Sequence, residues 1–362
     1  MSVALQSFFK GKRVLVTGHT GFKGSWLSLW LLELGATVIG LSLEPEKESL
    51  FEQLGLAEQL VHEIGDIRDF DCVKRVFKIH QPEVVLHLAA QPLVRASYDS
   101  PIETYATNVM GTVHVLQACR ETASVQVIVN VTTDKCYENK EWVFGYREVD
   151  PLGGYDPYSS SKACSELVTA AYRSSFLKNG PFLASARAGN VIGGGDWAMD
   201  RLIPDCIRSL RQGKPIIIRN PLAIRPWQHV LEPLSGYLWL ACRLGSDGKR
   251  FAGAWNMGPL PTGAVPVKTI VSQVIDTWGS GAYEVIPDGE YHEMSLLELD
   301  VSKAIHHLGW IPTLSVEEAV SDTVSWYYEQ INTNQFHAKK RCLEQIDTYT
   351  GLAAKKGNVW AI

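Results

Sequence analysis

Several signatures of familiar protein classes are missing from this 362-residue chain. Its seven cysteines include no CxxC pair, so we expect reduced thiols that mainly fill the core. There is no HExxH motif or other histidine spacing typical of a metal site, and no GxSxG turn that would carry a serine nucleophile. The sequence therefore predicts no bound metal and argues against the common class of serine hydrolases.

Clustered charge and long apolar runs are also scarce. The formal net charge is −5 and no block of lysine or arginine occurs, so we expect no nucleic-acid partner. The apolar stretch 26–41 is broken by Glu33 and Gly35 and is too short to span a bilayer. The first ten residues lack the basic start, apolar core and cleavage site of a signal peptide. These absences predict a cytoplasmic protein with no membrane partner.

Apolar residues make up 46% of the chain, enough for one large α/β domain and a smaller lobe. Strand patterns alternate with helical ones, and the expected strands lie near residues 13–18, 37–42, 61–65, 84–89, 126–132 and 182–187. The helices expected between them include 22–34, 101–121 and 157–178. This alternation predicts a doubly wound parallel sheet of the Rossmann type, with helices on both faces.

A glycine-rich loop joins the first expected strand to the first helix of that sheet. We expect Gly18 to allow a sharp turn, Gly21 to let backbone N–H groups approach a pyrophosphate, and Gly24 to let the helix pack against the strand. His19 and Phe22 belong to the same loop. A tight turn without a ligand is the alternative, but the strand before the loop and the helix after it favour NAD binding.

Tyr158 and Lys162 stand one helical turn apart, so both lie on one helix face. An ammonium beside a phenol favours the phenolate, so we expect the tyrosine pKa to move from about 10 toward working pH. A base that acts on a sugar hydroxyl requires such a shift. The alternative is a surface tyrosine and a solvated lysine.

Three expected strands end in residues suited to a cofactor or to catalysis. Asp66 and Ile67 follow one strand, where a carboxylate and a backbone amide can hydrogen-bond an adenine edge; a helix cap for the segment from Phe70 is the alternative role of Asp66. A second strand runs into the small residues of 88–91, which leave room for a ligand. A third ends in the polar cluster 132–135, at the edge where ligands bind in an open α/β sheet.

The character of the sequence changes near residue 190, where loop-rich segments carry arginines and aromatics. We expect an NAD-binding domain over 1–189 and a substrate lobe over 190–362 that interleaves with the last strands. Helical patterns recur at 266–278 and 315–331, whereas the polar tail from Asn332 shows no strong pattern.

At these motifs the chain resembles the extended short-chain dehydrogenases/reductases that act on nucleotide sugars. The resemblance covers roughly residues 10–315 and rests on Thr17 to Gly24, Gly65-Asp66-Ile67, His87 to Gln91, Asn108 to Thr112, Thr133-Asp134, Tyr158-x-x-x-Lys162 and Arg187 to Asn190. The segments 132–137, 225–234 and 299–304 are similar to members that dehydrate CDP-glucose. The resemblance implies redox-neutral conversion of CDP-glucose to CDP-4-keto-6-deoxyglucose with bound NAD, a step in deoxysugar synthesis for lipopolysaccharide.

The resemblance also implies residue roles. Tyr158 is the base for the carbon 4 hydroxyl, Lys162 lowers the tyrosine pKa and holds the nicotinamide ribose, and Thr133 binds the reacting oxygen. Asp134 is the acid for the leaving hydroxyl. Lys135 replaces a glutamate of relatives acting on dTDP-glucose, and either a base or an electrostatic role at carbon 5 is open to it.

Further positions concern the two ligands. The implied cofactor contacts are Gly18, His19, Gly21, Phe22, Gly24, Asp66, Ile67, Leu88, Ala89, Ala90, Tyr158 and Lys162, and the implied substrate contacts are Gln91, Asn190, Arg201 and Arg225. His19 either crowds the pyrophosphate or donates to it. The second strand ends in Ser42-Leu43-Glu44, with no arginine or lysine, which favours NAD over NADP but leaves the ribose partner open.

Assembly and rival functions complete the expectations. Helices 101–121 and 157–178 predict a homodimer, with candidate contacts at Ala106, Val109, Val113, Leu116, Val168 and Ala171. A nucleotide-sugar 4-epimerase is the main alternative, and Asp134 beside Thr133 argues against it. A non-catalytic dinucleotide sensor would have no use for the Tyr158 and Lys162 pair.

Overall fold

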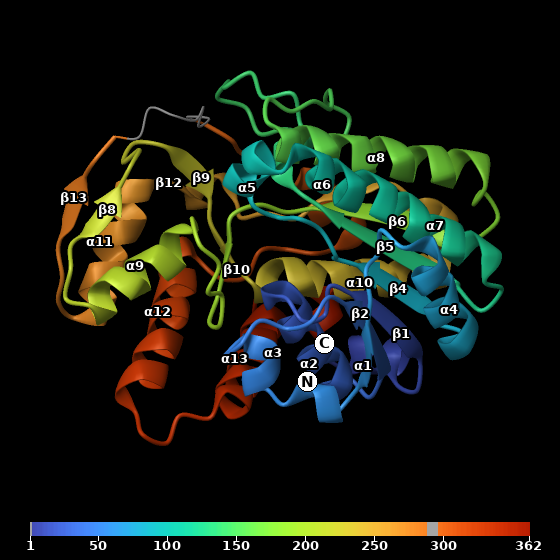
Figure 1. Ribbon diagram of the computed structural model, residues 1–362, viewed down its shortest axis with the longest axis horizontal. Coiled ribbons are helices and arrows are strands. Elements are labelled where there is room, and N and C mark those ends of the chain that lie inside the picture. The colour runs from blue at the N-terminus through green and yellow to red at the C-terminus, as the bar shows by residue number, and fades with distance from the viewer. Residues whose placement is uncertain (1, 288–295) are drawn as a thin grey trace.

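A parallel sheet forms the centre of the protein (Figure 1). The computed structural model describes residues 2–287 and 296–362, and within them this sheet has seven strands in the order β11-β6-β5-β4-β1-β2-β3. Its strands are β1 (Arg13–Thr17), β2 (Thr37–Ser42), β3 (Val61–Ile64), β4 (Val84–His87), β5 (Val127–Thr132), β6 (Phe182–Arg187) and β11 (Ala254–Asn256). Every neighbouring pair is parallel, which confirms the predicted doubly wound α/β fold.

Helices cover both faces of the sheet because alternate strand residues point to opposite sides. Val14 and Val16 of β1 join one core cluster, whereas Leu15 between them joins the other. The first face is covered by α1 (Val3–Phe9), α2 (Phe22–Glu33), α10 (Leu231–Phe251) and α13 (Ala338–Lys355). The second face is covered by α4 (Phe70–His80), α7 (Gly111–Glu121) and α8 (Pro157–Ser175).

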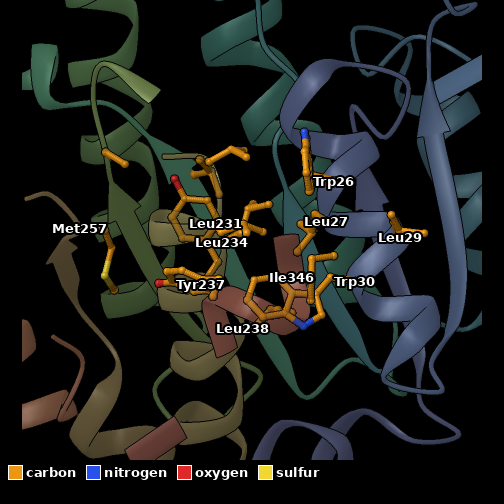
Figure 2. Close-up of a cluster of buried hydrophobic side chains, with 14 of the residues drawn as sticks. Trp26, Leu27, Leu29, Trp30, Leu231, Leu234, Tyr237, Leu238, Met257 and Ile346 are labelled. Atoms are coloured by element: carbon orange, nitrogen blue, oxygen red, sulfur yellow. The ribbon is translucent and has the colours of Figure 1, made fainter. Parts of the chain in front are cut away.

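The first core is rich in tryptophan. Figure 2 shows Trp26 and Trp30 of α2 beside Leu234 and Leu238 of α10, with Ile346 of α13 completing the contact. All five side chains are buried, so helices from three distant parts of the chain are held against one face of the sheet. The position of α2 is therefore fixed by packing along its length, and its first turn faces the carboxyl ends of the strands (Figure 1).

A smaller lobe lies beyond the carboxyl ends of the strands, at the left of Figure 1. Its helices are α9 (Leu202–Arg211), α11 (Val267–Trp278) and α12 (Val316–Asn332), and its short strand pairs are β8 (Ile216–Ile218) with β13 (Tyr283–Val285) and β9 (Ile224–Pro226) with β12 (Ala264–Pro266). A further pair, β7 (Val191–Ile192) with β10 (Gln228–His229), connects this lobe to the sheet. The lobe leaves a space between itself and the strand ends.

Short helices complete the chain. They are α3 (Leu50–Gln53), α5 (Val94–Asp99), α6 (Pro101–Tyr105) and the single turns η1 (Leu56–Glu58), η3 (Asp134–Cys136), η4 (Pro261–Gly263) and η6 (Val359–Ala361). The predicted helix 101–121 is divided, because a π-helical segment, η2 (Ala106–Met110), lies between α6 and α7. A second π-helical segment, η5 (Ala304–Leu308), ends at Gly309.

The expectation for the C-terminal tail was wrong. Residues 338–355 form α13, whose buried face consists of Ala338, Cys342, Gln345, Ile346, Tyr349, Thr350 and Ala353. Polar members on this face weaken the apolar periodicity that sequence analysis relies on. Each of the seven cysteines is a free thiol, as expected. Across residues 2–287 and 296–362, no helix is apolar enough over a sufficient length to cross a bilayer.

Candidate functional site

One large cavity, of ≈ 1630 Å³, lies between the carboxyl ends of the strands and the smaller lobe. The glycine loop after β1 lines one end, and residues 188–227 line the other. Among the residues predicted from the sequence to form the site, all line this cavity except His19 and Asp134. The structure therefore brings together side chains that lie up to about 200 residues apart in the chain.

The glycine loop has the close packing that the sequence predicted. Gly18 has φ +74°, and a Cβ there would lie 2.9 Å from the backbone of Ala89. A Cβ on Gly24 would lie 2.0 Å from the carbonyl oxygen of Gly18, so only glycine allows α2 to begin so close to β1. Gly21 is the N-cap of α2 and offers no side-chain cap. The first N–H groups of α2 therefore remain available to a pyrophosphate, and the loop fits a dinucleotide.

The position of the His19 side chain differs from both expectations. The imidazole is fully buried and lies behind the loop, with its Nε2 atom 2.7 Å from Nδ1 of His62 and its ring against Phe51. Gly40 of β2 makes room for it, because a Cβ there would lie 2.2 Å from the His19 ring. Burial and the nearby His62 lower the pKa of His19 to about 3. The ring is thus neutral and neither crowds nor contacts a pyrophosphate on the cavity side.

The cavity end next to β2 is acidic. Its wall includes Glu44, Glu46, Glu48 and Glu52, together with Lys47. The hydroxyl groups of Thr20 and Ser42 lie 2.8 Å apart at the end of β2, where a ribose would be bound in this fold. An additional phosphate on the ribose would meet these carboxylates, so this wall favours NAD over NADP.

Asp66 is not the cap of the next helix, which was the alternative role. Asp69 caps α4 by accepting hydrogen bonds from the backbone N–H groups of Asp71 and Cys72. The Asp66 carboxylate accepts from the Arg68 backbone at 2.8 Å and from its guanidinium at 2.6 Å. Asp66 and Ile67 both line the cavity. This leaves Asp66 at the cavity wall, where the resemblance places the adenine.

Leu88, Ala89, Ala90 and Gln91 line the cavity after β4, but the Gln91 side chain is hydrogen-bonded within the protein. Its amide nitrogen donates to the carbonyl of Leu93 and to the Thr104 hydroxyl, both at 3.0 Å, and its oxygen accepts from the Leu93 N–H. These bonds shape the turn into α5 and attach it to α6. The Gln91 amide is therefore occupied within the protein, contrary to the substrate contact expected of it.

Tyr158 and Lys162 lie on the first turns of α8, with 8% and 6% of their surfaces exposed. Burial lowers the pKa of Lys162 to about 8, while Glu166 opposes this shift. Burial raises the pKa of Tyr158 to about 12, with Asp134 adding to the rise and a hydrogen bond with Thr133 opposing it. The expected lowering of the tyrosine pKa is thus wrong, because burial outweighs the Thr133 hydrogen bond and the Arg201 charge, which oppose the rise.

The polar cluster after β5 separates into an exposed and a covered part. Thr133 and Lys135 line the cavity, whereas Asp134 is fully buried beneath them. The Asp134 Oδ1 atom accepts from the Thr133 hydroxyl at 2.9 Å and from Lys135 Nζ at 3.5 Å. Within the described part of the chain, its Oδ2 atom has no hydrogen-bond partner and lies against Gly189. Asp134 is therefore not part of the cavity wall, but it is bonded to Thr133 and Lys135, which are.

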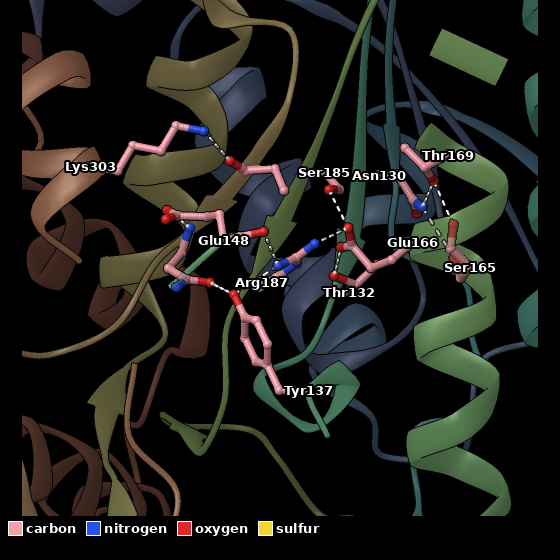
Figure 3. Close-up of polar contacts among 12 residues, drawn as sticks. Asn130, Thr132, Tyr137, Glu148, Ser165, Glu166, Thr169, Ser185, Arg187 and Lys303 are labelled. Carbon is pink, nitrogen blue, oxygen red and sulfur yellow. Dashed lines mark hydrogen bonds and ion pairs between the residues drawn. The ribbon is translucent and has the colours of Figure 1, made fainter. Parts of the chain in front are cut away.

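A buried ionic network supports this cluster from behind (Figure 3). Glu166 of α8 accepts hydrogen bonds from Thr132, Ser185 and Arg187, and the Arg187 guanidinium lies 2.7 Å from it. Arg187 also donates to the Tyr137 hydroxyl at 2.8 Å. Although burial opposes ionisation, Arg187 holds the pKa of Glu166 below its usual value. Sequence analysis missed Glu166; its position four residues after Lys162, on the same helix face, was the available signal.

Asn190, Arg201 and Arg225 line the other end of the cavity. Asn190 has φ +47°, and its buried Oδ1 atom has no partner among the residues described. Arg201 donates to Asp196 at 2.8 Å, which orients its guanidinium at the start of α9. The amide and the two guanidinium groups suit a diphosphate and its sugar, because arginine binds phosphate through a planar fork of N–H donors.

Comparisons with known proteins agree with this geometry. Residues 14–258 match the NAD dependent epimerase/dehydratase family. CDP-glucose 4,6-dehydratase from Salmonella typhimurium is 54% identical over 331 residues, which cover 89% of this chain and 92% of that protein. The dTDP-D-glucose 4,6-dehydratase from Bos taurus is 28% identical and covers 93% of each chain. The crystal structure of DesIV, a dTDP-glucose 4,6-dehydratase from Streptomyces venezuelae with NAD and TYD bound, superposes with TM-score 0.76 at 27% identity, over 88% of this chain and 97% of that one.

The glycine loop, the strand order and the Tyr158 and Lys162 pair define a Rossmann-type enzyme that uses a dinucleotide. The chain belongs to the NAD-dependent epimerase/dehydratase family.

Proposed function

We propose that this protein is a hydro-lyase that converts CDP-glucose to CDP-4-keto-6-deoxyglucose without net oxidation or reduction. The observation that supports it most directly is the cluster of Thr133, Asp134 and Lys135 beside Tyr158, together with 54% identity to a CDP-glucose 4,6-dehydratase across 89% of the chain. The cytosine base is assigned from that relative. The reaction class follows from the side chains around the cavity.

The oxidation half depends on Tyr158. In the proposed reaction its oxygen takes the proton of the carbon 4 hydroxyl, while Thr133 hydrogen-bonds the reacting oxygen. When bound, NAD supplies the acceptor for the carbon 4 hydride and later the donor of that hydride to carbon 6. A tyrosine with a pKa of about 12 is a proton donor at neutral pH, so a cation must approach before it acts as a base. Arg201 already lowers the pKa of Tyr158, and Lys162, one turn further along α8, is the second candidate.

The elimination half depends on the residues after β5. The ketone at carbon 4 makes the hydrogen at carbon 5 acidic, and its loss together with the carbon 6 hydroxyl releases water. Lys135 lines the cavity and would act at carbon 5, either as the base that takes the proton or as the cation that stabilises the enolate. Asp134 lies beneath the cavity and would supply the proton of the departing hydroxyl through the Thr133 hydroxyl, so that the net loss is one water. The Glu166 and Arg187 network keeps Thr132, and with it this turn, in position.

The test incubates the purified protein with NAD and, separately, CDP-, dTDP-, GDP- and UDP-glucose. We expect loss of one water from CDP-glucose by mass spectrometry and no steady accumulation of NADH. Deuterium placed at carbon 4 should appear at carbon 6 of the product. The matched control is Tyr158→Phe, which deletes the proton acceptor and little else, and should lower turnover by about 100-fold or more.

Other outcomes would contradict the proposal. Inversion at carbon 4 without loss of water would make the protein an epimerase. Stoichiometric NADH would make it an oxidising enzyme, and dehydration of another nucleotide sugar alone would move the substrate assignment away from CDP-glucose.

A further inference from the structure

Lys23 is a cavity residue that the chemistry described above does not use. It is the second residue of α2, between Phe22 and Gly24, and its side chain lines the cavity. The Lys23 side chain makes no hydrogen bond or ion pair in the part of the chain that the structure describes. The glycine loop therefore contributes a lysine side chain, in addition to backbone N–H groups, to the space where the ligands meet.

The charged groups that act on Lys23 come from both halves of the site. Arg201 belongs to the smaller lobe, and Lys162 lies on α8 beside the catalytic tyrosine. Two carboxylates also face it, Asp134 beneath the cavity floor and Asp196, which already pairs with Arg201. Lys23 is thus within electrostatic range of the catalytic residues and of the arginine expected to bind the substrate diphosphate.

Because three cations converge here and both carboxylates are already paired, Asp196 with Arg201 and Asp134 with Lys135, the cavity disfavours a charge on Lys23. Burial lowers the pKa of Lys23 to about 7, and Arg201 and Lys162 lower it further than the two aspartates raise it. An incoming diphosphate would reverse this balance, because it brings negative charge to an amine that has no partner.

We propose that Lys23 is a bridging cation that binds the pyrophosphate of NAD and the diphosphate of the nucleotide sugar together. This inference rests on the proposed function. The first ligand sits at the N-terminus of α2, which carries Lys23, and the second at Arg201, which acts directly on it. Each ligand therefore completes part of the binding site of the other. The expected result is positive coupling between the two binding events.

The test is titration calorimetry with NAD and CDP as probes, each alone and in the presence of the other. Lys23→Met should weaken both ligands about tenfold and remove their coupling, because the variant lacks the amine that would hydrogen-bond the phosphate groups of both. Lys23→Arg retains the charge and should keep the coupling. Lys178→Met is the matched control, because Lys178 is exposed and lies outside the cavity, so the variant should leave both affinities unchanged.

Proton uptake gives an independent readout. At pH 8 a Lys23 with a pKa of about 7 is mostly neutral, so binding should draw a proton from solution as the amine becomes charged. Calorimetry in buffers of different ionisation enthalpy measures this uptake. Lys162 contributes to the same signal, so the comparison is between wild type and Lys23→Met, in which the uptake should fall by up to one proton.

The bridge is wrong if Lys23→Met keeps the wild-type coupling, or if it weakens only one of the two ligands. Thermal melting separates these results from misfolding: removal of an amine whose side chain has no partner in the described part of the chain should leave the ligand-free melting temperature unchanged or higher. Turnover of CDP-glucose by the wild type is measured alongside. A wild type that binds NAD and CDP with coupling but does not dehydrate CDP-glucose would overturn the proposed function and leave the bridge intact.

Discussion

Lys135 and Asp134 are adjacent in the chain, yet only one of them reaches the cavity. Lys135 is 24% exposed and lines the wall, whereas the Asp134 carboxylate is covered by it and by Thr133. The Lys135 Nζ atom lies 3.5 Å from the Asp134 Oδ1 atom. We expect Lys135 to act at carbon 5 as a cation, with the role of general base as the alternative.

Lys135→Met separates oxidation from elimination. The variant should still oxidise carbon 4 and retain NADH with a 4-keto hexose, because Tyr158 and Lys162 are unchanged. Elimination should slow about 100-fold or more, since the enolate loses its nearby cation. Rapid mixing with absorbance detection of NADH and mass spectrometry of water loss measure the two steps. If the variant exchanges the carbon 5 hydrogen with deuterated water as fast as the wild type, Lys135 has neither role.

Single residues also show where sequence reasoning stops. The spacing of Tyr158 and Lys162 predicted a shared helix face, which the structure confirms, but not the burial that raises the tyrosine pKa. The loop motif identified the position of His19 but not the direction of its side chain. That direction depends on Gly40 and Phe51, which approach only in the folded protein.

At the scale of elements, two glycines at the start of α2 have different roles, one in packing and one in leaving space for a ligand. A Cβ on Gly24 would lie 2.0 Å from the Gly18 carbonyl oxygen, whereas one on Gly21 would lie 3.4 Å from the same atom, at ordinary contact. Gly24→Ala should therefore destabilise the fold by about 2 kcal/mol or more and abolish NAD binding. Gly21→Ala should leave the melting temperature within about 1 °C and weaken NAD, because the added methyl group faces the cavity.

Thermal melting and calorimetric titration of NAD check both variants. Equal loss of stability in the two variants would contradict the separate roles of these glycines.

The strands of the sheet were predictable because strands buried on both faces are read as short apolar runs. Sequence analysis did not predict helix α10, because its pattern is interrupted. It contains Pro233, Gly236 and Gly248, which weaken a helical pattern. Gly236 lies against Met257, and Gly248 against Phe182 of β6, where an added Cβ would lie 1.9 Å from the ring. The glycines allow the helix to approach the sheet, a requirement that only tertiary structure reveals.

At the scale of the whole molecule, Glu232 connects the sheet-covering helix α10 to the C-terminal region. Its carboxylate accepts hydrogen bonds from the backbone of Thr313 and Leu314 and from the Tyr349 hydroxyl. Burial raises the pKa of Glu232 from 4.5 to about 7. The folded protein therefore binds more protons than the unfolded chain between these values, and its stability should fall as pH rises from about 4.5 through 7.

Glu232→Gln tests this. The amide mimics the protonated acid, so the variant should match the wild type near pH 5 and exceed its free energy of unfolding by up to about 3 kcal/mol at pH 8. Urea midpoints across this pH range measure the difference. Glu317→Gln, at an exposed glutamate, is the control and should follow the wild type. A constant difference at all pH values would show that Glu232 does not titrate as described.

We propose that two copies of the chain associate through α6, α7 and α8. Ile102 of α6, Met110 of the adjoining η2 and Leu167 of α8 are 86%, 48% and 58% exposed. Two of the candidate contacts need correction: Leu116 is buried in the monomer core, and Val168 packs against the same cluster. Light scattering at micromolar concentration should give twice the 40.2 kDa of one chain, and Leu167→Glu should shift it toward the monomer. A wild type at the monomer mass would contradict this assembly.

The two ends of the cavity are lined by different parts of the chain, with residues from 88–95, 131–135 and 156–162 between them, and this division bears on how the protein can diversify. Residues 18–53 and 65–68 surround the end expected to hold the dinucleotide, whereas residues 188–225 surround the other end. Substitutions in the second stretch can change which nucleotide is accepted and leave the first surface untouched. Related enzymes can therefore keep one dinucleotide site and differ in the nucleotide sugar that they accept. In protein engineering, β8 and its loops can be exchanged for the same purpose.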